Sequence, residues 1–247
     1  MATQTIFKRH ELKFVITTKQ KEIIINSISP YMELDKYKRS TIKNIYFDTL
    51  DYRLIRRSIE KPEYKEKLRI RTYSNEISNN EVFIELKKKY DHVVYKRRML
   101  SEEQLAIKWL TGYIPNPYTT QISKEIDYFS KFYKDLKPLA FLSYERESFY
   151  EKDGGDLRIT FDENIIFRDE DITLSKPVYG TPILEKGKII MEVKCSKGLP
   201  LWLVDVLSSE HIYKTSFSKY GTAYTNIIYP KLKENTLNEE KEIILNA

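Results

Sequence analysis

The chain has 247 residues, of which 41% are hydrophobic and 32% are charged, so it can form a core and is not an intrinsically disordered protein. Its 42 lysines and arginines exceed its 36 acidic residues by a net +6, which is compatible with an anionic partner. A single cysteine, Cys195, excludes an intrachain disulfide, and no apolar run approaches the roughly 20 residues of a membrane span. We therefore expect a cytoplasmic protein, whose attachment to a membrane would need a tethering partner.

In the first half of the chain, charged and apolar residues alternate, which predicts β-strands because successive side chains of a strand point to opposite faces. Strands are expected at residues 9–16, 41–49, 65–73, 81–89 and 93–100. A helix is expected at 17–29, capped by Thr17 or Thr18. Turns are expected at 74–80 and at 91–92.

In the second half, two helices precede a return to strands. Ser101 and Gln104 form a capping-box pattern that predicts a helix ending near Trp109. Further elements are expected as a helix at 123–136, strands at 139–150, 157–162 and 188–195, and an apolar helix at 201–212. We expect one domain over residues 1–233, followed by a charged tail at 234–247 that could form a short helix.

The charged residues of these strands share one face, and the opposite face is mostly Leu, Ile, Val, Met and Phe. The charged set comprises Arg9, Glu11, Lys13, Lys67, Arg69, Arg71, Glu85, Lys87, Lys96, Arg98, Arg146, Arg158, Glu192 and Lys194. A single such strand usually turns its charges to water. The whole set favours charges that point inward, because crowded like charges repel unless an anion lies between them. The predicted fold is α+β and mainly antiparallel: an eight-stranded closed β-barrel with helices packed on the outside.

The residue types on the charged face favour phosphate chemistry. The planar fork of arginine matches phosphate oxygens, whereas lysine acts as a point charge. Glu-x-Lys occurs three times, at Glu11, Glu85 and Glu192. Carboxylates among cations could hold Mg²⁺ or Mn²⁺, although each pair could also be a simple intramolecular ion pair. Glu192 is the strongest ligand candidate, because its strand is the most apolar on the other face.

Nine segments together resemble the VTC domain of the triphosphate tunnel metalloenzymes, a CYTH-like superfamily. In chain order they are RHELKF, IYFDT, LRIRTY, FIELKKK, YKRRML, YERESF, LRITFD, MEVKCS and FSKYGTA. The superfamily usually opens with Glu-x-Glu-x-Lys. Arg9 at the first position is the VTC-like form, which argues against a plain adenylate cyclase or thiamine-triphosphatase. The resemblance implies an eight-stranded antiparallel tunnel lined by charges.

The resemblance also implies roles for individual residues. Triphosphate and the growing polymer would be bound by Lys13, Arg69, Arg71, Lys87, Lys96, Arg146, Arg158 and Lys219, with a hydrogen bond from Tyr144. Arg98 and Lys194 join this set because they lie on the same charged face. Glu192 would hold the metal, with Glu11 and Glu85 as further candidate ligands. The expected catalytic residues are Arg69, Arg71, Lys87, Arg146, Arg158 and Glu192.

Function follows from the resemblance, with alternatives that the residues leave open. VTC-like members transfer the γ-phosphoryl group of ATP to a polyphosphate end, so we expect a metal-dependent polyphosphate polymerase. A hydrolase of tripolyphosphate or nucleoside triphosphates, and a non-catalytic binder of polyphosphate or inositol polyphosphate, fit the same residues. Nucleic acid is not an expected partner, because the tyrosines mostly avoid the arginine face and the glutamates would repel a phosphate backbone.

Overall fold

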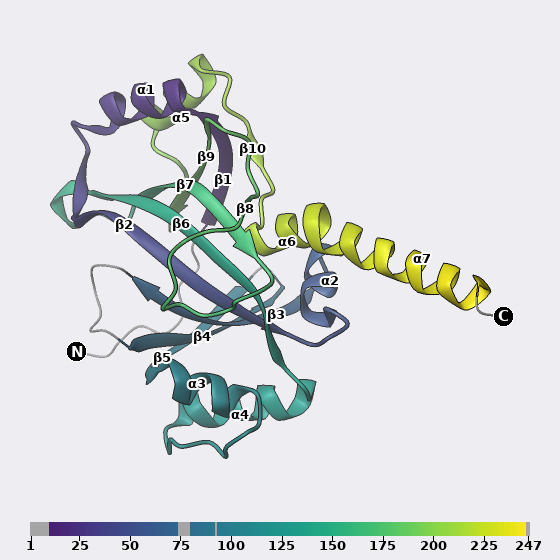
Figure 1. Ribbon diagram of the computed structural model, residues 1–247. Helices are drawn as coiled ribbons and strands as arrows, with labels where there is room; N and C mark the ends of the chain where they lie inside the picture. Colours follow the sequence, from purple (N-terminus) through teal and green to yellow (C-terminus); the bar gives the residue numbers. More distant parts are fainter. Residues whose placement is uncertain (1–9, 74–79, 92, 246–247) are drawn as a thin grey trace.

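The computed structural model describes residues 10–73, 80–91 and 93–245 (Figure 1). Arg9, His92 and most of the predicted turn at 74–80 lie outside these ranges. The long strands are β1 (His10–Thr17), β2 (Met32–Asp48), β3 (Tyr64–Tyr73), β4 (Glu81–Tyr90), β5 (Val93–Glu102), β6 (Lys137–Glu151), β7 (Arg158–Arg168) and β9 (Lys188–Cys195). Two short strands are β8 (Thr181–Pro182) and β10 (Lys214–Thr215). The eight long strands confirm the predicted number.

All strand pairings in the described residues are antiparallel, in the order β10-β1-β9-β7-β6-β2-β3-β4-β5, with β8 beside β7. No hydrogen-bonded ladder joins β5 to β10 within the described ranges. The two ends of the sheet nevertheless approach each other through side chains. Glu11 of β1 and Lys87 of β4 form an ion pair at 3.7 Å, so the sheet curls until its ends face each other across an interior.

Helices pack on the outside of the curled sheet, as predicted. The described helices are α1 (Thr18–Ile28), α2 (Arg53–Ile59), α3 (Glu103–Leu110), α4 (Gln121–Tyr133), α5 (Leu201–Ser209), α6 (Lys219–Ala223) and α7 (Tyr229–Leu245), of which α7 does not cover the sheet. A 3₁₀ turn (Lys152–Gly154) and a π-helical segment (Tyr224–Ile228) complete the described elements. Figure 1 shows α1 and α5 beside β1 and β9, and α3 and α4 beside β4 and β5.

Two apolar clusters place the hydrophobic face of the strands outward. Leu68 of β3 and Ile84 of β4 are fully buried against Ile126 and Phe129 of α4. On the other side, Phe14, Met191 and Val193 pack with residues of α1 and α5, and Cys195 lies buried in the same cluster. Because strand side chains alternate, burial of this face under helices sends the charged residues inward.

Helix α2 was not predicted, and it depends on Asp48 at the end of β2. One carboxylate oxygen of Asp48 accepts hydrogen bonds from the backbone N–H groups of Thr49 and Leu54, at 2.9 and 2.8 Å. The other accepts one from the N–H of Ile55 at 3.0 Å. These contacts satisfy amides that a helix start leaves without intrahelical partners.

One local prediction was wrong. Ser101 lies in β5, and α3 begins at Glu103 with no side-chain cap, because the Ser101 hydroxyl instead bonds the Glu102 carbonyl and the Tyr118 hydroxyl. Helix α7 starts at Tyr229 and extends away from the sheet (Figure 1), and it includes the described part of the charged tail, for which the sequence allows a short helix. Within the described ranges, no helix is both long and apolar enough to cross a membrane.

Candidate active site

The interior of the curled sheet holds a cavity of about 440 Å³, here called the tunnel cavity. All eleven predicted phosphate-binding residues and all three predicted metal ligands line it. Twelve lysines and arginines face only four carboxylates in its wall. Such an excess of one charge in a confined space favours an anionic ligand. The structure thus brings the whole predicted set together, although the role of each residue stays a prediction.

Arg69 and Arg71 of β3 are fixed by hydrogen bonds on two sides. The Arg69 Nη1 group donates to the Tyr46 hydroxyl at 2.9 Å, and its Nε donates to Glu85 at 2.8 Å. Arg71 donates only to neutral acceptors: the Asn44 side chain at 2.8 Å and the hydroxyls of Tyr73 and Tyr144 at 3.0 and 3.3 Å. These bonds hold the charge of Arg71 in place, and its ion pair with Glu85 is long, at 3.9 Å from Nε to the carboxylate.

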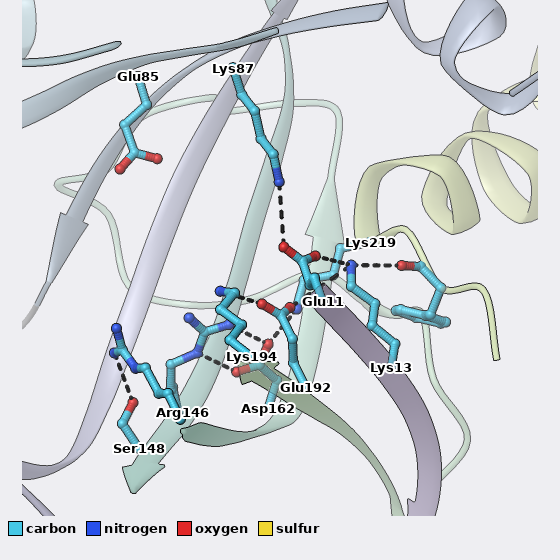
Figure 2. A network of polar contacts seen from close by, with 12 residues as sticks. Glu11, Lys13, Glu85, Lys87, Arg146, Ser148, Asp162, Glu192, Lys194 and Lys219 are labelled. Carbon is cyan, nitrogen blue, oxygen red and sulfur yellow. Dashed lines mark hydrogen bonds and ion pairs between the residues drawn. The ribbon is translucent and has the colours of Figure 1, made fainter. Parts of the chain in front are cut away.

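Glu85 lies among cations rather than beside the other two glutamates. Its carboxylate contacts Arg69 Nη2 at 2.6 Å, Lys96 Nζ at 2.7 Å and Arg98 Nε at 3.4 Å. Burial raises the pKa of Glu85, but the positive charges of Arg69, Arg71 and Lys96 outweigh burial and hold that pKa far below its usual value. Figure 2 shows Glu85 apart from Glu11 and Glu192. This geometry suits a residue that positions three cations, so we leave Glu85 out of the proposed metal site.

Asp162 of β7 anchors a second group of cations, which come from β6 and α6. Arg146 donates to both carboxylate oxygens of Asp162, at 2.5 and 2.7 Å, and Lys219 pairs with the same carboxylate (Figure 2). Asp162 is fully buried, which raises its pKa, but the two cations lower that pKa to about 2. Asp162 therefore fixes Arg146 of β6 and Lys219 of α6 in one place.

Glu11 and Glu192 are the carboxylates that lie together in the tunnel cavity. Glu192 pairs with Lys194 and lies 3.9 Å from the Nζ of Lys13, which also contacts Glu11 at 3.4 Å. Burial raises the pKa of Glu192, but Lys194 and Lys13 hold it well below its usual value. Burial and the charge of Glu192 raise the pKa of Glu11, but Lys87, Lys13 and Lys194 hold that pKa below its usual value. The shared contact with Lys13 places the two carboxylates close together.

The fit of a divalent metal to these residues can be judged from their chemistry. Mg²⁺ typically takes one or two protein carboxylates and fills its remaining positions with water and substrate phosphates. Glu11 and Glu192 supply two such oxygen donors on neighbouring strands. No group of three or more His, Cys, Asp or Glu side chains that could hold a metal occurs in the described residues. The donor set therefore suits a metal shared with a phosphate ligand.

One buried arginine donor in the tunnel cavity lacks an acceptor. The Nε group of Arg158 has no hydrogen-bond partner among the described residues, whereas that of Arg98 lies 3.4 Å from the Glu85 carboxylate. The Arg158 fork makes one hydrogen bond at its end, a 3.4 Å bond from Nη2 to the Ser148 hydroxyl. Buried N–H groups in folded proteins nearly always have acceptors. The Arg158 Nε group therefore marks a position where a ligand oxygen would complete the site.

Sequence reasoning missed several residues that shape this site. Asp162 has the same strand parity as Arg158 in LRITFD, and an acid among so many bases is the signal that could have identified it. Tyr46 and Asn44 lie on the strand before the basic strand β3, and no pattern in their own segment pointed to arginine partners. Only the pairing of β2 with β3, which sets Tyr46 opposite Arg69 and Asn44 opposite Arg71, reveals their function.

Tyr46 gives a spectroscopic test of the charge in the tunnel cavity. Burial raises the pKa of its phenol, but Arg69, Lys67 and Arg71 lower it to about 8. We expect ultraviolet absorbance to show one tyrosine ionising near pH 8 in the wild type. This early step should be absent from Tyr46→Phe and present in Tyr113→Phe, which removes an exposed phenol. An identical titration of the wild type and Tyr46→Phe would contradict the described geometry.

Comparisons with known proteins agree with this architecture. The model of the family described as "VTC domain" matches residues 8–228. The vacuolar transporter chaperone complex subunit 4 of Schizosaccharomyces pombe is 24% identical over 90% of this chain, and the alignment spans 36% of that relative's length. A solved structure described as an adenylate cyclase candidate from Bacillus halodurans has a TM-score of 0.53 at 15% identity, covering 87% of this chain and 96% of its own. At that identity the likeness shows a shared fold.

Proposed function

The chain belongs to the VTC domain family, and from this premise we propose that it transfers the γ-phosphoryl group of ATP to the end of an inorganic polyphosphate chain. The cytoplasm is the proposed site of this reaction, with any membrane attachment supplied by a partner protein. One observation carries the proposal. The tunnel cavity gathers cations from several strands and from α6, and its buried Arg158 Nε donor has no acceptor in the described residues.

The proposed reaction needs no nucleophile from the protein. A terminal oxygen of the acceptor phosphate attacks the γ-phosphorus of ATP, one new P–O bond forms, and the bond to the bridging oxygen breaks to release ADP. Such a transfer depends on positioning and on neutralisation of charge. Arg69 and Arg71, fixed by Tyr46 and Asn44, would hold the equatorial phosphate oxygens in one register.

The part of the wall formed by β6, β7 and α6 would hold the second phosphate group. Asp162 fixes Arg146 and Lys219, and the remaining N–H groups of these side chains can donate to phosphate oxygens. Tyr144 accepts a hydrogen bond from Arg71, which leaves its own hydroxyl proton available to the ligand. The separation of fixed cations on two walls suits a donor phosphate and an acceptor phosphate brought into line.

We propose Mn²⁺ or Mg²⁺ as the cofactor, held by Glu192 and Glu11. A bound divalent ion would neutralise negative charge on the phosphates during transfer. Lys13 and Lys194 pair with these carboxylates in the structure described here. With a metal held by the carboxylates, both lysines would be available to phosphate, which is consistent with their predicted role as phosphate ligands.

Product analysis tests the proposal directly. The protein is incubated with ATP labelled at the γ-phosphate and with Mn²⁺, and products are separated by length on a denaturing gel. We expect labelled polymers that lengthen with time, together with one ADP for each unit added. Labelled orthophosphate without polymer would contradict the polymerase assignment and would support a triphosphate hydrolase instead. Tight binding of ATP or polyphosphate without turnover would instead identify a non-catalytic binder.

A further inference from the structure

A second cavity of about 950 Å³ opens beside the tunnel cavity. Its walls come from β1, the end of α2, β3, β4 and the segment from β10 to α6. The two cavities are adjacent, because part of their wall is shared. The shared lining residues are Glu11, Lys13, Lys67, Lys87, Val94 and Ser218. A ligand that occupies the tunnel cavity could therefore continue past Lys67 and Lys87 into the second space.

The second cavity is rich in lysine, and we call it the lysine vestibule. Its basic wall residues are Lys13, Lys61, Lys65, Lys67, Lys87, Lys89 and Lys214. Among the described residues that line it, Glu11 is the single carboxylate and none is an arginine, whereas five of the twelve described cations of the tunnel cavity are arginines. The charge of the vestibule is thus even more one-sided than that of the tunnel cavity.

The register of β3 and β4 places lysines directly opposite each other. Lys65 faces Lys89, and one step inward Lys67 faces Lys87. Like charges in such pairs are destabilising. Lys65, Lys67 and Lys89 form no ion pair with any described residue; Lys65 donates to the Ser58 carbonyl at 3.3 Å and Lys67 to the Ser218 hydroxyl at 3.2 Å. The two rungs form a ladder of four lysines, of which only Lys87 has an ion-pair partner among the described residues, Glu11 at 3.7 Å.

Burial and mutual repulsion both act on this ladder. Burial lowers the pKa of Lys67, and repulsion from Lys13, Lys87 and Lys65 lowers it further, to about 8 despite the opposing effect of Tyr46. Burial followed by the charge of Lys89 lowers the pKa of Lys65 as well. An anion between the rungs would relieve this repulsion, and the repulsion therefore favours binding of an anionic ligand at this position.

The change from arginine to lysine distinguishes what the two cavities can do. A fixed guanidinium fork binds phosphate oxygens in one orientation, whereas the ammonium group of lysine is a flexible point charge without directional preference. The tunnel cavity can therefore hold reacting phosphates in register. The vestibule can attract a phosphate chain while still allowing the chain to move by one unit after each addition.

We infer that the lysine vestibule is a second anion subsite, which holds the part of a linear inorganic polyphosphate chain that lies beyond the reacting units. This inference rests on the proposed function and adds that product length depends on residues outside the tunnel cavity. The outer rung of Lys65 and Lys89 provides the test, because neither residue lines the tunnel cavity.

The experiment compares Lys65→Gln/Lys89→Gln with the wild type in two assays. Binding of tripolyphosphate and of long-chain polyphosphate is measured over a range of salt concentrations. We expect affinity for the long chain to fall about 10-fold more than affinity for tripolyphosphate, and the log–log salt slope for the long chain to shrink by about 1.4, at about 0.7 for each lost contact. In the ATP assay, product lengths should become shorter.

The matched control is Lys19→Gln/Lys124→Gln, which makes the same change in net charge at exposed positions of α1 and α4. Its long-chain affinity should stay at the wild-type value. Equal losses of affinity for tripolyphosphate and long chains in the Lys65→Gln/Lys89→Gln variant, or no loss for either, would overturn the inference. A protein that makes no polymer would disprove the proposed polymerase activity. The vestibule inference would still be tested, because the affinities for long-chain polyphosphate and tripolyphosphate are measured without turnover.

Discussion

Replacing Glu192 with glutamine should lower the rate of phosphoryl transfer by on the order of 100-fold or more, as expected for loss of a group that stabilises transition-state charge through a metal. Glutamine keeps the shape of the side chain but removes the charge that binds a divalent ion. The side chain is 8% exposed and contacts Lys194 and Lys13, so its environment is well defined. The measurement is the initial rate of label transfer from ATP at saturating Mn²⁺.

The same variant should separate catalysis from binding. Removal of a carboxylate from a cationic cavity removes a repulsive charge, so tripolyphosphate affinity without metal should be retained or increased. Glu22→Gln, at an exposed position of α1, serves as the control and should leave both quantities unchanged. A Glu192→Gln protein with full transfer activity would remove Glu192 from the proposed metal site. A variant that loses tripolyphosphate affinity to the same extent as activity would assign Glu192 to positioning of Lys13 and Lys194 instead.

Replacing Asp162 with asparagine should cost about 3–5 kcal/mol of the free energy of unfolding, the range for breaking a buried ion pair by removing one partner. Asp162 is 0% exposed and compensates both Arg146 and Lys219. Without its charge, Arg146 and Lys219 lose their shared hydrogen-bonded partner and two largely buried cations repel each other. The free energy of unfolding is measured by chemical denaturation at neutral pH.

Asp169→Asn is the matched control, because Asp169 pairs with Lys231 at 2.9 Å on the exposed surface. Exposed pairs contribute about 0–1 kcal/mol, so this change should be nearly neutral. An equal effect of the two substitutions would show that the Asp162 network contributes no more than a surface ion pair. Tripolyphosphate added to Asp162→Asn should recover part of the lost stability, because the anion compensates the same cations.

Acid unfolding gives a further measure of Asp162. Its folded-state pKa of about 2 lies below the unfolded value of 3.8, so its contribution is fully present above about pH 4 and is lost as the pH falls through about 2. The difference corresponds to about 2 kcal/mol. The wild type should lose about 2 kcal/mol of its free energy of unfolding between pH 4 and pH 2 through protonation of Asp162, and Asp162→Asn should not show this loss. A variant with an unchanged pH profile would contradict the lowered pKa of Asp162.

The sequence by itself determined the strands and their faces. Alternation in segments such as RHELKF and LRIRTY is sufficient, because a strand has only two faces and a one-residue shift would bury the charges of Lys13 or Arg69 under the helices. The family also followed from the sequence, since nine short segments occur in order and the family model matches residues 8–228. Local signals were weaker: the Ser101 pattern suggested a cap that strand β5 overrides.

Only the tertiary structure decided which partners each charged residue contacts. Glu11, Glu85 and Glu192 have the same Glu-x-Lys pattern, yet Glu85 contacts Arg69, Lys96 and Arg98 while Glu11 and Glu192 lie together. That difference arises from which strands are neighbours, because β4 lies between β3 and β5 whereas β1 lies beside β9. The Asp162 anchor and the lysine ladder depend on pairing and register in the same way. A strand's own residues fix which face a side chain occupies, but the residues it meets across that face belong to distant parts of the chain.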